Sequence, residues 1–70
     1  MSKVERETVA GTVEEALPNT LFRVALEDGN IVLSYLSGKM RVNRIKVLVG
    51  DSVRLELDPY GGKARIVKRL

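Results

Sequence analysis

The stretch SGKMRVNRIKVLVG, residues 37–50, distinguishes between the folds open to this chain, because it is the one long connection in a sequence that otherwise turns tightly. Its apolar residues Met40, Val42 and Ile45 do not share one face at about 100° per residue, which excludes a long amphipathic helix. We predict one or two helical turns over residues 37–43, with Ser37 as the N-cap. Residues 45–47 are predicted to be extended chain that returns to a sheet.

On both sides of this connection, apolar and polar residues alternate with the period of two that is typical of half-buried strands. We predict strands over residues 8–15, 21–27, 31–36, 51–57 and 63–69. The pair Asp28-Gly29 predicts a hairpin turn, and DPYGG, residues 58–62, predicts a second turn. Gly11, inside the first strand, indicates a bend or the close approach of another backbone segment.

The alternation also predicts which side chains enter the core. In the third strand it assigns Ile31, Leu33 and Tyr35 to the apolar face, so Tyr35 is predicted to be a core residue. Tyr60, in a turn, is predicted to be exposed. The other predicted core residues come from strands two, four and five: Phe22, Val24, Leu26, Val53, Leu55, Leu57, Ala64 and Ile66.

Five short strands with an insertion after the third are the layout of an OB-fold barrel. A small SH3-like barrel is the alternative, since it also uses about five strands, but the long insertion favours the OB layout. We therefore predict an all-β chain: a five-stranded OB-fold barrel with a short helical turn in the loop between strands three and four. Its 70 residues suffice for a single S1-like domain over residues 1–70. Residues 1–6 are expected to be flexible and the protein monomeric.

The composition excludes most catalytic chemistry. The chain has neither cysteine nor histidine, so disulfides, thiolate chemistry, the usual zinc ligand sets and serine–histidine catalysis are excluded. We predict a protein that is not an enzyme and uses no cofactor or metal. No apolar run approaches the roughly 20 residues that span a bilayer, and the N-terminus lacks a signal-peptide core, so we expect no membrane association and a cytoplasmic location.

The distribution of charge indicates a polyanionic partner. Residues 1–36 carry three basic and six acidic side chains, whereas residues 37–70 carry nine basic and three acidic ones. Such asymmetry between halves is typical of nucleic-acid binding, and an ordinary solvated surface is the alternative. Only Phe22, Tyr35 and Tyr60 are aromatic, which favours structured RNA over a single strand stacked on several rings.

The candidate RNA-binding residues fall into two basic groups, because cations neutralise phosphates and release counterions. The first group lies in the long connection, and the second lies in the last strand; neither contains an acid. Tyr60 and Arg23 are lesser candidates. The two groups are Lys39, Arg41, Arg44 and Lys46, and Arg65, Lys68 and Arg69, the latter preceded by Lys63.

Three segments resemble the bacterial translation initiation factor one family: GTVEEALPNTLFRVALEDGN, YLSGKMRVNRIKVLVGDSV, and LDPY followed by ARIVKR. The resemblance covers about residues 7–69. It implies an OB-fold protein that binds the small ribosomal subunit through ribosomal RNA at its decoding (A) site and blocks premature tRNA entry during initiation. It also implies cooperation with initiation factors two and three, and RNA contact through residues 37–46.

Two other functions stay open on the residues alone. One is a general RNA-binding or RNA-chaperone module of the cold-shock kind, which shares the fold but exposes several aromatic residues on one face. The other is a structural module that binds another protein. In that case the long connection, residues 37–50, which we call the basic loop, is an ordinary solvated surface.

Overall fold

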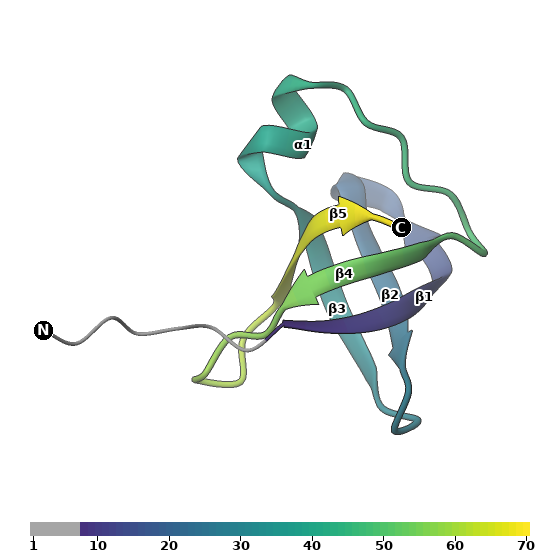
Figure 1. Cartoon of the computed structure of the whole chain (residues 1–70), viewed down its shortest axis with the longest axis vertical. Coiled ribbons are helices and arrows are strands. Elements are labelled where there is room, and N and C mark those ends of the chain that lie inside the picture. Colours follow the sequence, from purple (N-terminus) through teal and green to yellow (C-terminus); the bar gives the residue numbers. More distant parts are fainter. Residues whose placement is uncertain (1–7) are drawn as a thin grey trace, which may run out of the picture.

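Five strands close into a barrel in which each strand pairs with two others (Figure 1). The computed structural model describes residues 8–70; the predicted flexibility of residues 1–6 lies outside them. The strand order around the barrel is β1-β2-β3-β5-β4, and β4 pairs with β1 to close it. All pairs are antiparallel except β3 with β5. The elements are β1 (Thr8–Leu17), the 3-10 helix η1 (Pro18–Thr20), β2 (Leu21–Leu26), β3 (Ile31–Leu36), α1 (Gly38–Val42), β4 (Ser52–Glu56) and β5 (Ala64–Arg69).

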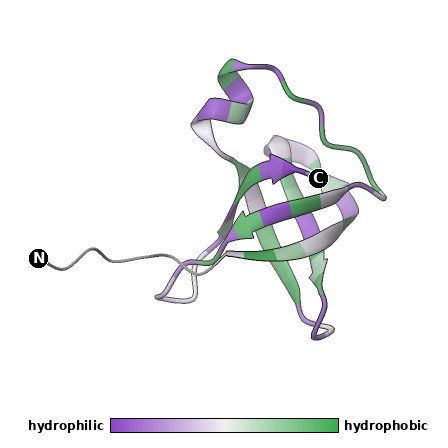
Figure 2. Ribbon diagram, in the orientation of Figure 1, coloured by the Kyte–Doolittle hydropathy of each residue, from purple (hydrophilic) through white to green (hydrophobic). Residues whose placement is uncertain are grey.

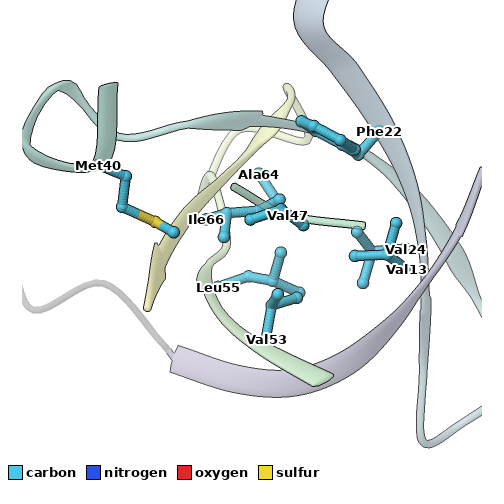
Figure 3. Close-up of a cluster of buried hydrophobic side chains, with 9 residues drawn as sticks. All are labelled: Val13, Phe22, Val24, Met40, Val47, Val53, Leu55, Ala64 and Ile66. Atoms are coloured by element: carbon cyan, nitrogen blue, oxygen red, sulfur yellow. The ribbon is translucent and has the colours of Figure 1, made fainter. Parts of the chain in front are cut away.

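The core fills the barrel and extends beneath α1 (Figure 3). Strands β2, β4 and β5 bury six of the eight side chains that their alternation predicts, whereas Leu26 and Leu57 are half-buried and Leu57 lies just after β4. Met40 from α1 and Val47 from the following loop complete the core, so the long connection is packed onto the barrel. The buried hydrophobic residues are Val13, Phe22, Val24, Met40, Val47, Val53, Leu55, Ala64 and Ile66.

The predicted inward face of β3 is wrong. Ser34 is fully buried, whereas Ile31 and Leu33 are 55% and 37% exposed and Tyr35 is half-buried. The pairing with β2 explains this, because Phe22 lies opposite Ser34 in the register and directly paired residues share a face. Both faces of β3 contain apolar residues, so its own alternation did not determine which face turns inward. The buried Ser34 hydroxyl donates to the carbonyl oxygen of Val32 (3.4 Å).

Gly11 marks a close approach between strands, as its position predicted. A Cβ atom there would lie 2.6 Å from Cγ1 of Val24 and 2.9 Å from the carbonyl oxygen of Ala25. Gly11 pairs with Leu26 on one side and with Val53 on the other. Glycine therefore allows β1 to pack against β2 at this point of the barrel wall.

The helical turn is confirmed, and residues 45–47, which were predicted to be extended chain that returns to the sheet, lead toward β4 without pairing as a strand. The Ser37 hydroxyl accepts a hydrogen bond from the amide of Met40 (3.3 Å) and caps α1. After α1, residues 43–51 contain no strand. Because β3 already pairs with β2 and β5, and β4 with β1 and β5, the closed barrel offers these residues no edge to join.

Candidate nucleic-acid interface

A hollow of about 410 Å³ lies between α1 and the end of β5. It brings Lys39 of the first basic group together with Lys68 and Arg69 of the second, which lie more than 20 residues later in the sequence. Figure 2 shows hydrophilic residues in α1 and at the end of β5, at the same end of the barrel. The lining residues are Lys39, Met40, Asn43, Ile45, Val67, Lys68 and Arg69. The cations therefore surround a floor that is partly apolar.

Within residues 8–70, the three cations that line the hollow and the three other cations of the first basic group are exposed and lack an acidic partner. The segment 37–50 contains no acid, and the two ion pairs found within residues 8–70 involve other arginines. Lys68 and Arg69 lie in β5, opposite Arg54 and Val53 of β4, so they are part of the barrel and not a free tail. The six residues are Lys39, Arg41, Arg44, Lys46, Lys68 and Arg69. Their charge is available to an external polyanion.

Arg44 lies just after α1, at a position of the helix end that glycine usually occupies. Arg44 has φ 54°, and its amide donates to the carbonyl oxygen of Arg41 (3.1 Å). The amide of Ile45 donates to the carbonyl oxygen of Met40 (3.0 Å). This is a Schellman motif, with Arg44 at the left-handed position. The conformation is one that glycine adopts more readily, which makes the Arg44 side chain a candidate for a functional role.

Hydrogen bonds hold the long connection, residues 37–50, against the barrel at several points. The amide of Ser37, its first residue, donates a hydrogen bond to the carbonyl oxygen of Ile66 in β5 (2.9 Å). The carboxylate of Asp51 accepts from the amide of Leu48 (2.8 Å), and the amide of Gly50 donates to the carbonyl oxygen of Val13 (2.8 Å). Between these points, Nη1 of Arg69 donates to the carbonyl oxygen of Lys46 (3.0 Å). The basic loop is therefore ordered by the barrel.

Arg65 differs from the other members of the two basic groups because it has an acidic partner. Its Nε (3.1 Å) and Nη2 both donate to Oε1 of Glu56, which lies opposite it on β4. The hydrogen bond to Glu56, and then the negative charge of that carboxylate, raise the pKa of Arg65. The absence of acids near Arg65 in the sequence did not reveal this partner, because cross-strand pairing supplies it. Much of its charge is compensated within the protein.

Tyr60 and Arg23 do not line the hollow. Tyr60 is 93% exposed, as predicted, at the tip of the β4–β5 turn, and Figure 1 places this turn and α1 at opposite ends of β5. The carboxylate of Asp58 holds that turn by accepting from the amides of Tyr60 and Gly62 (both 3.0 Å). Arg23, on β2, forms an exposed ion pair with Glu15 (3.5 Å between Nε and Oε1).

The apolar floor of the hollow was not predicted as part of the site. Met40 and Ile45 come from the ends of the Schellman motif, and Val67 comes from the outer side of β5. Hydrophobic residues at these two positions of the motif commonly contact each other, which was the available sequence signal. Within the described residues, no group of three or more histidine, cysteine or acidic side chains is arranged to hold a metal ion. In residues 8–70, helices are also too short to cross a membrane.

Comparison with known proteins identifies the family. The sequence model of the family described as translation initiation factor 1A / IF-1 matches residues 1–70. The chain belongs to this family. It is therefore a translation initiation factor, a non-enzymatic RNA-binding protein, and family membership implies binding to the small ribosomal subunit. Family membership therefore supports the initiation factor over the two alternatives, an RNA-chaperone module and a protein-binding structural module.

Solved structures with the same barrel agree with this assignment. The solution structure of translation initiation factor one from the Wolbachia endosymbiont strain TRS of Brugia malayi is 36% identical, with a TM-score of 0.78 over 91% of this chain and 77% of that chain. It confirms the predicted OB fold.

Two larger proteins contain a similar barrel. YjeQ from Thermotoga maritima is 28% identical, with a TM-score of 0.75, and YloQ, a circularly permuted GTPase, is 21% identical, with a TM-score of 0.78. In both cases the match covers 91% of this chain but 23% of the other protein. The similarity to YloQ concerns the fold alone.

Proposed function

We propose that this protein binds the decoding (A) site of the small ribosomal subunit through ribosomal RNA and blocks premature tRNA entry during initiation. The observation that supports this function most directly is the hollow between α1 and β5, which is lined by Lys39, Lys68 and Arg69, cations that have no acidic partner within residues 8–70. Such a surface suits a folded RNA, whose closely spaced phosphates attract several cations at once. The protein acts as a single monomeric domain in the cytoplasm, together with initiation factors two and three.

The exposed cations have different roles in this proposal. Lys39, Arg41, Arg44 and Lys46 are the main phosphate and groove contacts, since the ordered loop presents all four side chains to solvent. Arginine adds bidentate hydrogen bonding to phosphate, which lysine lacks. The second set lies on β5, where Glu56 reduces the contribution of Arg65. It comprises Arg65, Lys68 and Arg69, and Tyr60 and Arg23 are peripheral contacts.

The mechanism is exclusion by occupancy. Tyr60 is the only one of the three aromatic side chains that is exposed, so the surface is poorly suited to stacking successive bases of a single strand. An ordered basic loop instead fits a preformed RNA surface, and its binding requires little ordering of the protein. While the protein occupies the site, tRNA is kept out.

The salt dependence of binding tests the interface. If about six phosphates are contacted, the slope of log affinity against log salt should be about −4 to −5. We expect the double variant Arg41→Ala/Arg44→Ala to flatten this slope by about 1–2 units, while its thermal midpoint stays close to that of the parent. Lys63→Ala is the control, because Lys63 is exposed but lies beside the β4–β5 turn, outside both the basic loop and the hollow. An unchanged slope in the double variant would remove these arginines from the interface.

Competition with tRNA tests the exclusion mechanism separately. A tRNA anticodon stem-loop that binds the decoding site should displace the protein from isolated small subunits as its concentration rises. Occupancy by the protein should raise the apparent dissociation constant of the stem-loop in return, since the two are mutually exclusive. Simultaneous binding of both at saturation would show that the protein occupies a different place on the subunit.

A further inference from the structure

The segment around Lys46 has one hydrogen bond to the barrel that comes from a side chain far along the sequence. Nη1 of Arg69 donates to the carbonyl oxygen of Lys46 (3.0 Å), across a separation of 23 residues. Both residues are exposed, so the contact lies on the surface that carries the basic loop. A guanidinium group has five donors, which allows it to hold a carbonyl oxygen while other donors face outward.

This hydrogen bond lies between two other points at which the loop is held. On its N-terminal side, the amide of Ile45 donates to Met40, and on its C-terminal side the amide of Leu48 donates to Asp51. The buried side chain of Val47 lies between them, so the path of the chain on both sides of Lys46 is fixed. The Arg69 contact is the hydrogen bond that joins this stretch to β5.

We propose that Arg69 is a positioning residue, which holds the Lys46 segment against β5 and so presents Arg44 and Lys46 to the RNA in a fixed arrangement. This inference rests on the proposed function. Its physical basis is entropic: a loop that is ordered before binding does not need to be ordered by the RNA, so less of the binding free energy is lost. Arg69 thus affects affinity through the geometry of its neighbours as well as through its own charge.

Lys68 supplies a matched control for charge. It precedes Arg69 on the same strand and is also exposed, and its side chain forms no hydrogen bond within the described part of the chain. The variants Arg69→Met and Lys68→Met each remove one positive charge and leave an unbranched side chain. Only the first removes the hydrogen bond to Lys46.

Hydrogen exchange of the free protein gives the first readout. A hydrogen bond of this kind typically has a net stabilising effect that corresponds to a factor of about two to ten in an opening equilibrium. We expect Arg69→Met to accelerate exchange of the Ile45 and Leu48 amides by that factor, whereas Lys68→Met leaves them unchanged. The amide of Val13, bonded to the carbonyl oxygen of Asp51 (2.9 Å), reports on the barrel. Acceleration that is absent, or that Val13 shares equally, would overturn the proposal.

Binding to small subunits across a salt series gives the second readout. Lys68→Met should flatten the slope by up to about 0.9 and leave the affinity extrapolated to 1 M salt close to that of the parent. Arg69→Met should in addition lower the extrapolated affinity by about two- to tenfold. Equal extrapolated affinities for the two variants would overturn the proposal. If the parent protein fails to bind small subunits, the proposed function fails, and the exchange experiment still decides whether Arg69 orders the loop.

Discussion

Arg44 occupies a backbone conformation that most side chains avoid. Its φ of 54° lies in the left-handed region, which costs a residue with a Cβ atom roughly 1–2 kcal/mol relative to the right-handed form. Arg44→Gly should therefore raise the free energy of unfolding by about 1 kcal/mol, while it weakens binding to the small subunit. Urea denaturation and a subunit binding assay measure the two effects.

Alanine at the same position separates backbone strain from charge. Arg44→Ala removes the cation but keeps a Cβ atom, so we expect weaker binding without the gain in stability. If Arg44→Gly bound as tightly as the parent, the side chain would have no part in RNA recognition.

Gly11 is constrained by the space around it. The Cβ atom of Gly11→Ala would lie 2.6 Å from a Val24 methyl group and 2.9 Å from a backbone oxygen, so the strands must move apart. We expect a loss of about 1–3 kcal/mol in the free energy of unfolding, as for other overpacked sites. Gly38→Ala is the matched control, since no atom lies within 4 Å of its Cβ position and alanine favours the helix that begins there. Equal denaturation midpoints for the two variants would contradict the close contact.

Among the elements, β3 and the segment 45–47 show which properties of a structure a local sequence does not determine. The period of two predicted all five strands, and the serine cap predicted α1, because both depend on neighbouring residues. The inward face of β3 depends on its register with β2, which places Ser34 opposite Phe22. The path of residues 45–47 depends on which strand edges remain free. Neither property is encoded within the segment itself.

The candidate site was also predicted only in part, because some of its features depend on residues far apart in the sequence. The sequence revealed the basic loop, because its cations are closely spaced and free of acids. The hollow could not be predicted, since it requires α1 to pack against a strand that begins more than 20 residues later. The partners of Arg65 and Arg69 likewise come from distant parts of the chain, Glu56 on β4 and the carbonyl oxygen of Lys46.

The pairing of β4 with β5 predicts that Arg65 contributes less to RNA binding than Lys68. Glu56 compensates the charge of Arg65, whereas Lys68 has no acidic partner within the described residues. In a salt series with small subunits, Arg65→Ala should flatten the slope by less than Lys68→Ala does. The Glu56 contact raises the pKa of Arg65, so its charge is retained at every working pH and its contribution to stability does not fall between pH 6 and 9. A larger effect of Arg65→Ala would contradict this order.

For the molecule as a whole, stability depends on one small core. Leu55 is fully buried at its centre, and Leu55→Ala should lower the free energy of unfolding by about 2–5 kcal/mol, a large share of the total for a small domain. Ile31→Ala should change it by no more than about 0.5 kcal/mol, because this side chain faces outward from β3. Urea denaturation of both variants tests the two faces together. A large loss for Ile31→Ala would restore the opposite orientation of β3.

The place of β5 between β3 and β4 has a consequence for how the protein is made. These two strands precede β5 in the chain and do not pair with each other, so the barrel cannot close until Ala64–Arg69 has been synthesised and released. The same six residues accept the hydrogen bond from Ser37, hold Lys46 and form one wall of the hollow. A nascent chain that ends before Ala64 therefore lacks both the closed fold and the assembled RNA-binding surface, so both are completed together once β5 is available.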